Sequence, residues 1–235
     1  MDLISEIWQR ATSTQAPAVP AVVVVTAGVA LLCLALPRLW HLTRHALTIV
    51  HEGAHATVAV LTGRRLAGIR LHSDTSGLTV SVGRPRGPGM VATAFAGYVG
   101  PAVLGLGAAW LLGRGYAVGL LWLLVLALAL LLLQIRNWYG LWTVLVSGVV
   151  LVGVTWWAPL EWQVTFAYTV TWFLLLGAPR AVLELQHSRR RARGRGQSDA
   201  DILGNLTRTP GILWVGIFLV VTLGALALGA FWLVG

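Results

Sequence analysis

Residues 40–61 read WHLTRHALTIVHEGAHATVAVL, an apolar stretch that holds three ionisable side chains close together: His51, Glu52 and His55. About 20 residues at a rise of about 1.5 Å cross a hydrocarbon layer of roughly 30 Å. Lipid offers the backbone no hydrogen-bond partners, so a segment that crosses it is a helix. Ionisable groups inside such a helix are costly and usually functional. The stretch therefore predicts a membrane helix that carries a polar site.

The rest of the chain has the same apolar character. Of its 235 residues, 57% are hydrophobic and only 11% are charged, against about 25% charged in soluble domains. We therefore expect an all-α polytopic membrane protein with a single domain over residues 1–235, and we exclude a soluble globule. Seven candidate spans follow one another: Val19–Leu36, Trp40–Leu61, Gly89–Leu112, Tyr116–Leu133, Trp138–Trp157, Val164–Glu184 and Ile212–Val234.

Two stretches between the spans have a different pattern. Within Arg64–Pro88, apolar and polar residues alternate on both sides of Asp74-Thr75-Ser76-Gly77. Alternation of period two around a turn that contains glycine predicts a small β-hairpin. The polar, arginine-rich segment Gln186–Pro210 is expected to be a loop.

The net charge of +9 comes from arginine alone. The arginines lie between the apolar runs, which favours a role in membrane topology over nucleic-acid binding. If the loop Arg189–Arg195 is cytoplasmic, seven spans place the amino terminus in the cytoplasm, in agreement with the positive-inside rule. Residues 1–18 lack a signal-peptide pattern, so the first span should stay attached. The use of arginine alone suggests a bacterial cell membrane, and Cys33, the single cysteine, excludes a disulfide within the chain.

The sequence His51-Glu52-Gly53-Ala54-His55 matches the pattern HExxH. Residues i and i+4 lie on one face of a helix, where two imidazoles can bind one zinc ion. Glu52 lies beside the first imidazole and is placed as the general base that takes a proton from water. His41 and His45 form a second pair of this spacing, but they are rotated too far around the helix to share the same metal.

Zinc requires a third protein ligand, and the chain has eight acidic residues. Asp199 and Asp201 are expected on the same side of the membrane as His55, and we take Asp199 as the ligand, with Asp201 left as an alternative. His187 is a weaker candidate. Ser198-Asp199-Ala200-Asp201 is also typical of a helix cap, which would need no metal.

These residues resemble the site-2 protease family of intramembrane zinc metalloproteases, in particular its peptidase-M50B-like branch. The HExxH motif, the hairpin Gly68–Val82, Ala96–Pro101 and Ser198–Asp201 match in order, and the resemblance covers most of residues 40–210. It implies a zinc peptidase that cleaves membrane-spanning segments of other proteins, with the hairpin adding a strand to an unwound substrate. The family usually takes its third ligand from an Asp-Gly motif, and the matching place here holds Asn137, which leaves it as a third alternative ligand that would bind zinc weakly through its neutral carbonyl oxygen.

Two other functions remain open on the sequence alone. Asn137 in place of an aspartate fits a degenerate relative that binds transmembrane partners without cleaving them. His51, Glu52 and His55 could also form the proton relay of a transporter or channel, although no repeat of spans supports this.

Overall fold

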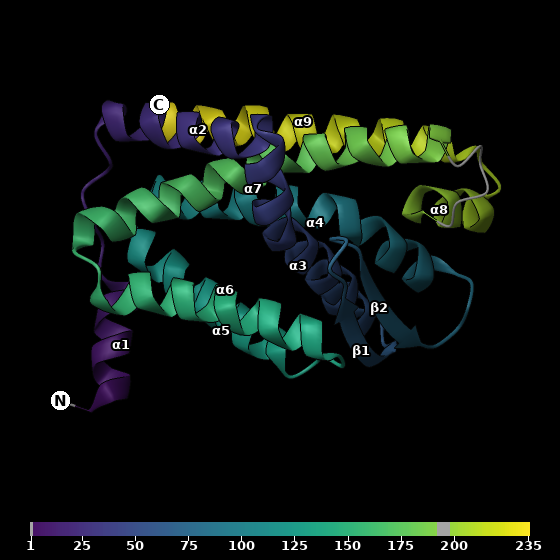
Figure 1. Cartoon of the computed structure of the whole chain (residues 1–235), viewed down its shortest axis with the longest axis horizontal. Coiled ribbons are helices and arrows are strands. Elements are labelled where there is room, and N and C mark those ends of the chain that lie inside the picture. The colour runs from purple at the N-terminus through teal and green to yellow at the C-terminus, as the bar shows by residue number, and fades with distance from the viewer. Residues whose placement is uncertain (1, 192–197) are drawn as a thin grey trace.

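The computed structural model describes residues 2–191 and 198–235, in which helices dominate and a single hairpin interrupts them (Figure 1). The elements follow one another as α1 (Leu3–Thr12), α2 (Pro20–Ala35), α3 (Pro37–Leu61), β1 (Arg65–Leu71), β2 (Gly77–Val82), α4 (Pro88–Leu112), α5 (Ala117–Leu132), α6 (Trp138–Trp157), α7 (Leu160–Arg191), α8 (Asp199–Thr207) and α9 (Gly211–Val234). The predicted fold class, helical with a small hairpin after the second apolar segment, is confirmed.

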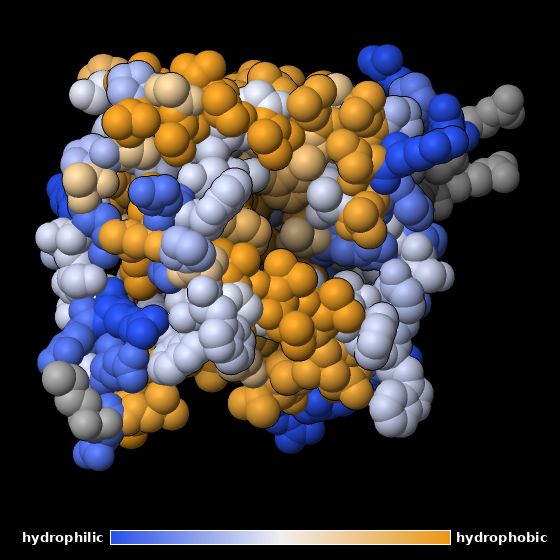
Figure 2. All heavy atoms as spheres, turned by 60° about the vertical axis from the view of Figure 1, so that its left-hand side comes forward, coloured by the Kyte–Doolittle hydropathy of each residue, from blue (hydrophilic) through white to orange (hydrophobic). Residues whose placement is uncertain are grey.

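The number of membrane spans differs from the seven expected. Each of the seven predicted segments overlaps a helix, but only α4, α6, α7 and α9 are long and apolar enough to cross a membrane singly. The helices α2 and α3 meet this test only as a pair, and α5 is a shorter apolar helix. Large apolar side chains are exposed along these helices, and on the face drawn in Figure 2 they gather along the top and over the middle.

The pair α2 and α3 is bent by 104° at Leu36 and Pro37. Proline has no N–H to continue the first helix, and it disfavours helical geometry in the residue before it. Leu36 accordingly has extended backbone angles, while Pro37 begins the next helix. The two predicted spans are therefore the two arms of one bent segment.

The helix α4 lies at the centre of the fold and packs against α3, α7 and α9. Small residues allow its close approach to α3: a Cβ on Gly100 would lie 2.3 Å from the Cβ of Ala54. This close packing brings α4 against the face of α3 that carries the histidines.

The hairpin is antiparallel, with Leu71 opposite Gly77 and Arg65 opposite Val82. The outer edge of β1 is also occupied, because the linker between α5 and α6 pairs with Ile69. The Ile69 N–H donates to the Gln134 carbonyl at 2.8 Å, and the Arg136 N–H donates to the Ile69 carbonyl at 2.9 Å. The other edge of the hairpin is formed by β2.

The prediction of a loop over Gln186–Pro210 is wrong for most of its described residues. The helix α7 continues to Arg191, where arginines near a helix C-terminus are favourable, and α8 begins at Asp199. Arg193 and Arg195, which were included in the topology argument, lie outside the described residues. The helix α1 was not predicted; it has no buried residues.

Candidate metal centre

The helix α3 carries His51, Glu52 and His55 in its second half, as the sequence predicted. The rings of the two histidines lie 4.7 Å apart, and their Nε2 atoms are separated by 3.1 Å. His55 and Glu52 are buried, and His51 is partly buried. One face of α3 therefore brings two imidazole nitrogens together in a protected position.

Asp199, the first residue of α8, completes a triangle with these nitrogens. Its Oδ2 lies 3.2 Å from Nε2 of His51 and 3.2 Å from Nε2 of His55. In a tetrahedral zinc site with bonds of about 2.0–2.1 Å, ligand atoms are about 3.3 Å apart. The three atoms therefore fit one face of such a tetrahedron, and the fourth corner is left for water or substrate, as in catalytic zinc sites.

A backbone contact orients the ring of His55. Its Nδ1 lies 2.7 Å from the carbonyl oxygen of Thr93 in α4. A neutral imidazole whose Nδ1–H donates to this carbonyl keeps its Nε2 lone pair for a metal, which is the usual arrangement around zinc-binding histidines. This contact was not predicted, because it depends on how α4 lies against α3.

Gly97 of α4 makes room for the two rings. A Cβ at this position would lie 2.4 Å from Nε2 of His55 and 2.6 Å from Cε1 of His51. On the next residue, the ring of Tyr98 packs edge-on against His51 at 4.8 Å and stacks on Phe218 of α9 at 5.2 Å. Gly97 belongs to the stretch Ala96–Pro101 that resembles the site-2 proteases, but its place beside the two imidazole rings was not predicted.

The carboxylate of Glu52 is held by the hairpin. Thr79 of β2 donates its hydroxyl to Oε2 of Glu52 at 2.6 Å, and a Cβ on Gly77 would lie 2.4 Å from Oε1. The hairpin is itself fixed to α3, because the hydroxyl of Thr48 donates to the Thr75 carbonyl at 2.8 Å. The strand thus sets the position of the carboxylate predicted to be the base.

The structure separates the two aspartates that the sequence left as alternatives. Asp201 closes a capping box with Ser198 at the start of α8 and accepts hydrogen bonds from Arg189 at 2.7 and 3.0 Å. Burial raises the pKa of Asp201, but the hydrogen bonds from Arg189 and Ser198 outweigh it and hold that pKa below its usual value. Asp201 therefore serves the helix cap, whereas Asp199 faces the two imidazoles.

The other candidate ligands lie elsewhere. The side-chain amide of Asn137 pairs with both backbone groups of Leu71, accepting at 3.2 Å and donating at 2.7 Å. His187 is exposed on α7, and His45 faces the hydroxyl of Tyr139 at 3.3 Å. Within residues 2–191 and 198–235, one group of three metal-binding side chains was found: His51, His55 and Asp199.

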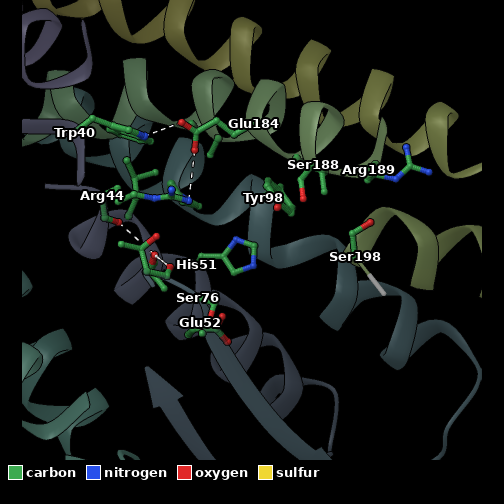
Figure 3. A pocket seen from close by; sticks show the side chains of 18 residues that line it. Trp40, Arg44, His51, Glu52, Ser76, Tyr98, Glu184, Ser188, Arg189 and Ser198 are labelled. Carbon is green, nitrogen blue, oxygen red and sulfur yellow. Dashed lines mark hydrogen bonds and ion pairs between the residues drawn. The ribbon is translucent and has the colours of Figure 1, made fainter. Parts of the chain in front are cut away.

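A cleft of about 440 Å³ opens beside the centre, between α3, the hairpin turn and α7 (Figure 3). His51 and Glu52 line it. At one end, Glu184 of α7 contacts Arg44 at 3.4 Å and Trp40 at 2.6 Å across the cleft. Ser198 lies towards the other end, so the site is reached through a groove between helices.

Comparison with curated proteins and with solved structures finds no significant match. A protein-family model, described as Peptidase M50B-like, matches residues 23–229, which is most of the chain and includes every residue of the candidate centre. The family match and the long apolar helices together show that the chain is an integral membrane protein of a protease family. The chain belongs to the Peptidase M50B-like family, as its resemblance to the site-2 proteases indicated.

Proposed function

We propose that the protein is an intramembrane zinc metallopeptidase that hydrolyses peptide bonds in membrane-spanning segments of other proteins. The observation that carries the proposal is the triangle formed by Nε2 of His51, Nε2 of His55 and Oδ2 of Asp199, with its edges of 3.1 and 3.2 Å. Two imidazoles and one carboxylate are a known ligand set for catalytic zinc.

Bound zinc would supply a Lewis acid that acidifies a water molecule and polarises the scissile carbonyl. Glu52 would accept the proton of that water and later pass it to the leaving amine. The hydroxyl of Thr79 donates a hydrogen bond to Oε2 of Glu52. Glu52 also lines the cleft, where the water and the substrate would meet. Burial of Glu52 keeps bulk water from competing for these contacts.

The hairpin supports an extended substrate. The outer edge of β1 is paired with residues 134–136, so an added strand would pair with β2, which also holds Glu52 through Thr79. Leu78, Val80 and Val82 of β2 are exposed, while Thr79 and Ser81 are partly buried. An apolar outer surface on this strand suits an apolar segment that has unwound from its own helix, because strand addition replaces the helix hydrogen bonds.

Position 137 holds asparagine where the family pattern has aspartate, and this motivated the alternative of a protein that binds partners without cleaving them. Asn137 is used to pair with β1, and the carboxylate that it lacks is offered by Asp199. This arrangement supports the catalytic reading. We keep a bacterial cell membrane as the proposed location.

The test is metal analysis and proteolysis with the full chain in detergent or liposomes. We expect about one zinc ion per chain, lost in His51→Ala and in Asp199→Ala. Glu52→Gln should keep zinc and lose cleavage of a co-reconstituted transmembrane substrate by at least about 100-fold, since it removes the general base. A chain that binds no zinc, or a Glu52→Gln variant that cleaves at the wild-type rate, would refute the proposal, and unchanged cellular function of that variant would favour the non-catalytic alternative.

A further inference from the structure

The candidate ligands come from two helices that are far apart in the sequence. His51 and His55 lie on α3, whereas Asp199 begins α8, a helix of nine residues. The distances of 3.2 Å from Asp199 to both imidazoles therefore depend on how α8 is docked and rotated. Something beyond the ligands has to set that orientation, since three atoms must meet at one point within a few tenths of an ångström.

Apolar packing sets which face of α8 is buried, and polar contacts set the finer position of its first turn. Ala200 and Leu203 are fully buried and belong to a cluster with Val182, Val215 and Phe218. Such burial contributes through the area removed from water and has no preferred direction. A directional contact is needed to aim the carboxylate of Asp199.

Arg189 of α7 supplies a directional contact. Its Nε and Nη2 donate to Oδ1 of Asp201 at 3.0 and 2.7 Å, and its Nη1 donates to Oε1 of Gln186 at 3.0 Å. The other carboxylate oxygen of Asp201 accepts the Ser198 hydroxyl at 2.6 Å. The carboxylate of Asp201, two residues beyond Asp199, therefore belongs both to the ion pair with Arg189 and to the capping box. Hydrogen bonds between charged groups are stronger than those between neutral groups.

The fold leaves space for this pair. A Cβ on Gly211, the first residue of α9, would lie 2.5 Å from Nη2 of Arg189 and 3.1 Å from Oδ1 of Asp201. The side chains of Arg189 and Asp201 are only 16% and 18% exposed, so water competes weakly for their contact. Three helices, α7, α8 and α9, therefore meet around the pair.

We infer that Arg189 and Asp201 form a positioning pair that holds Asp199 at the metal centre and thereby sets its zinc affinity. The inference rests on the proposed zinc site. Neither residue is among the three candidate ligands. Arg189 also lines the cleft, so zinc affinity, which needs no substrate, is the measurement that isolates its effect through Asp199.

The experiment measures zinc affinity of the detergent-solubilised full chain by competition with a chromogenic chelator. Arg189→Gln should weaken zinc binding about 10- to 100-fold, the effect usual for removing a group that orients a ligand. Arg190→Gln, at the neighbouring exposed position, should leave affinity unchanged. In an Asp199→Asn background, Arg189→Gln should have no further effect, because the ligand through which it acts is already lost. A merely structural role of Arg189 would still lower the affinity in that background.

The outcomes separate the two proposals. Wild-type protein that binds zinc and cleaves substrate, with equal affinity in Arg189→Gln, would overturn the positioning pair and leave the proposed function standing. The same loss of affinity with and without Asp199 would also overturn it. Wild-type protein without zinc affinity would instead refute the metal centre itself, and the positioning pair with it.

Discussion

Two glycines at the candidate centre matter because they have no side chain. Gly77 and Gly97 approach the side chains of Glu52 and His55 so closely that a methyl group at either glycine would lie 2.4 Å from the nearest side-chain atom. Real Cβ contacts are not this short, so a larger residue would displace the side chain that faces it. The absence of a side chain on α4 and on β2 is thus part of the geometry of the site.

The substitution Gly97→Ala tests this at the residue scale. Alanine favours the helix more than glycine, so the fold should be kept, but its methyl would push against both imidazoles. We expect zinc affinity to fall at least about tenfold, as for other disturbances of ligand orientation, with no fall in the thermal unfolding temperature. Gly107→Ala is the matched control, because that glycine lies on the same helix with open space around it. Equal zinc affinity of the two variants would contradict the close approach.

At the scale of elements, the linker between α5 and α6 lies along the outer edge of β1 and forms an isolated bridge with it. It pairs with Ile69 through its backbone and with Leu71 through the side chain of Asn137. A carboxamide suits this place because it both donates and accepts, whereas a carboxylate only accepts. The residue that departs from the pattern of the site-2 proteases has a local structural reason to be an asparagine.

We therefore expect Asn137→Asp to weaken the fold without gaining a ligand. The aspartate would lose the donor and place an oxygen against the Leu71 carbonyl, at a cost of about 1–3 kcal/mol. Thermal unfolding should shift to lower temperature, with zinc content unchanged. Increased zinc affinity in this variant would show that the residue faces the metal. Asn137→Gln is a useful comparison, since it keeps donor and acceptor on a longer arm.

At the scale of the whole molecule, the bend between α2 and α3 decides the membrane topology. With the bent pair counted as one span, up to five segments are long and apolar enough to cross a membrane. If the shorter helix α5 also crosses, we expect six passages rather than seven. Both ends of the chain then lie at one end of the bundle, opposite α8, as Figure 1 shows. The prediction of a cytoplasmic amino terminus depended on seven separate spans. With six, we expect the amino terminus on the opposite side of the membrane from the arginines of α7.

Labelling of single cysteines in a Cys33→Ser background tests the topology. Ser13→Cys and Gly235→Cys mark the two ends, and Arg86→Cys marks the exposed turn before α4. Arginine-rich segments stay in the cytoplasm, so an impermeant maleimide added to intact cells should label both ends and leave position 86 unlabelled. Labelling of position 235 without position 13 would restore seven spans and a cytoplasmic amino terminus.

The sequence by itself determined the helical membrane class, the hairpin and the pairing of His51 with His55 around Glu52. These features depend on hydrophobic length and on local periodicity, which short stretches of sequence carry. Only the tertiary structure shows that Asp199, rather than Asp201, lies beside the two imidazoles, and that Gly97 and Thr79 contact the side chains of the candidate centre. The contacts of these residues depend on how elements separated in the sequence pack together. Thr79 reaches Glu52 from the hairpin that follows α3, and Asp199 reaches His51 from a helix more than a hundred positions away.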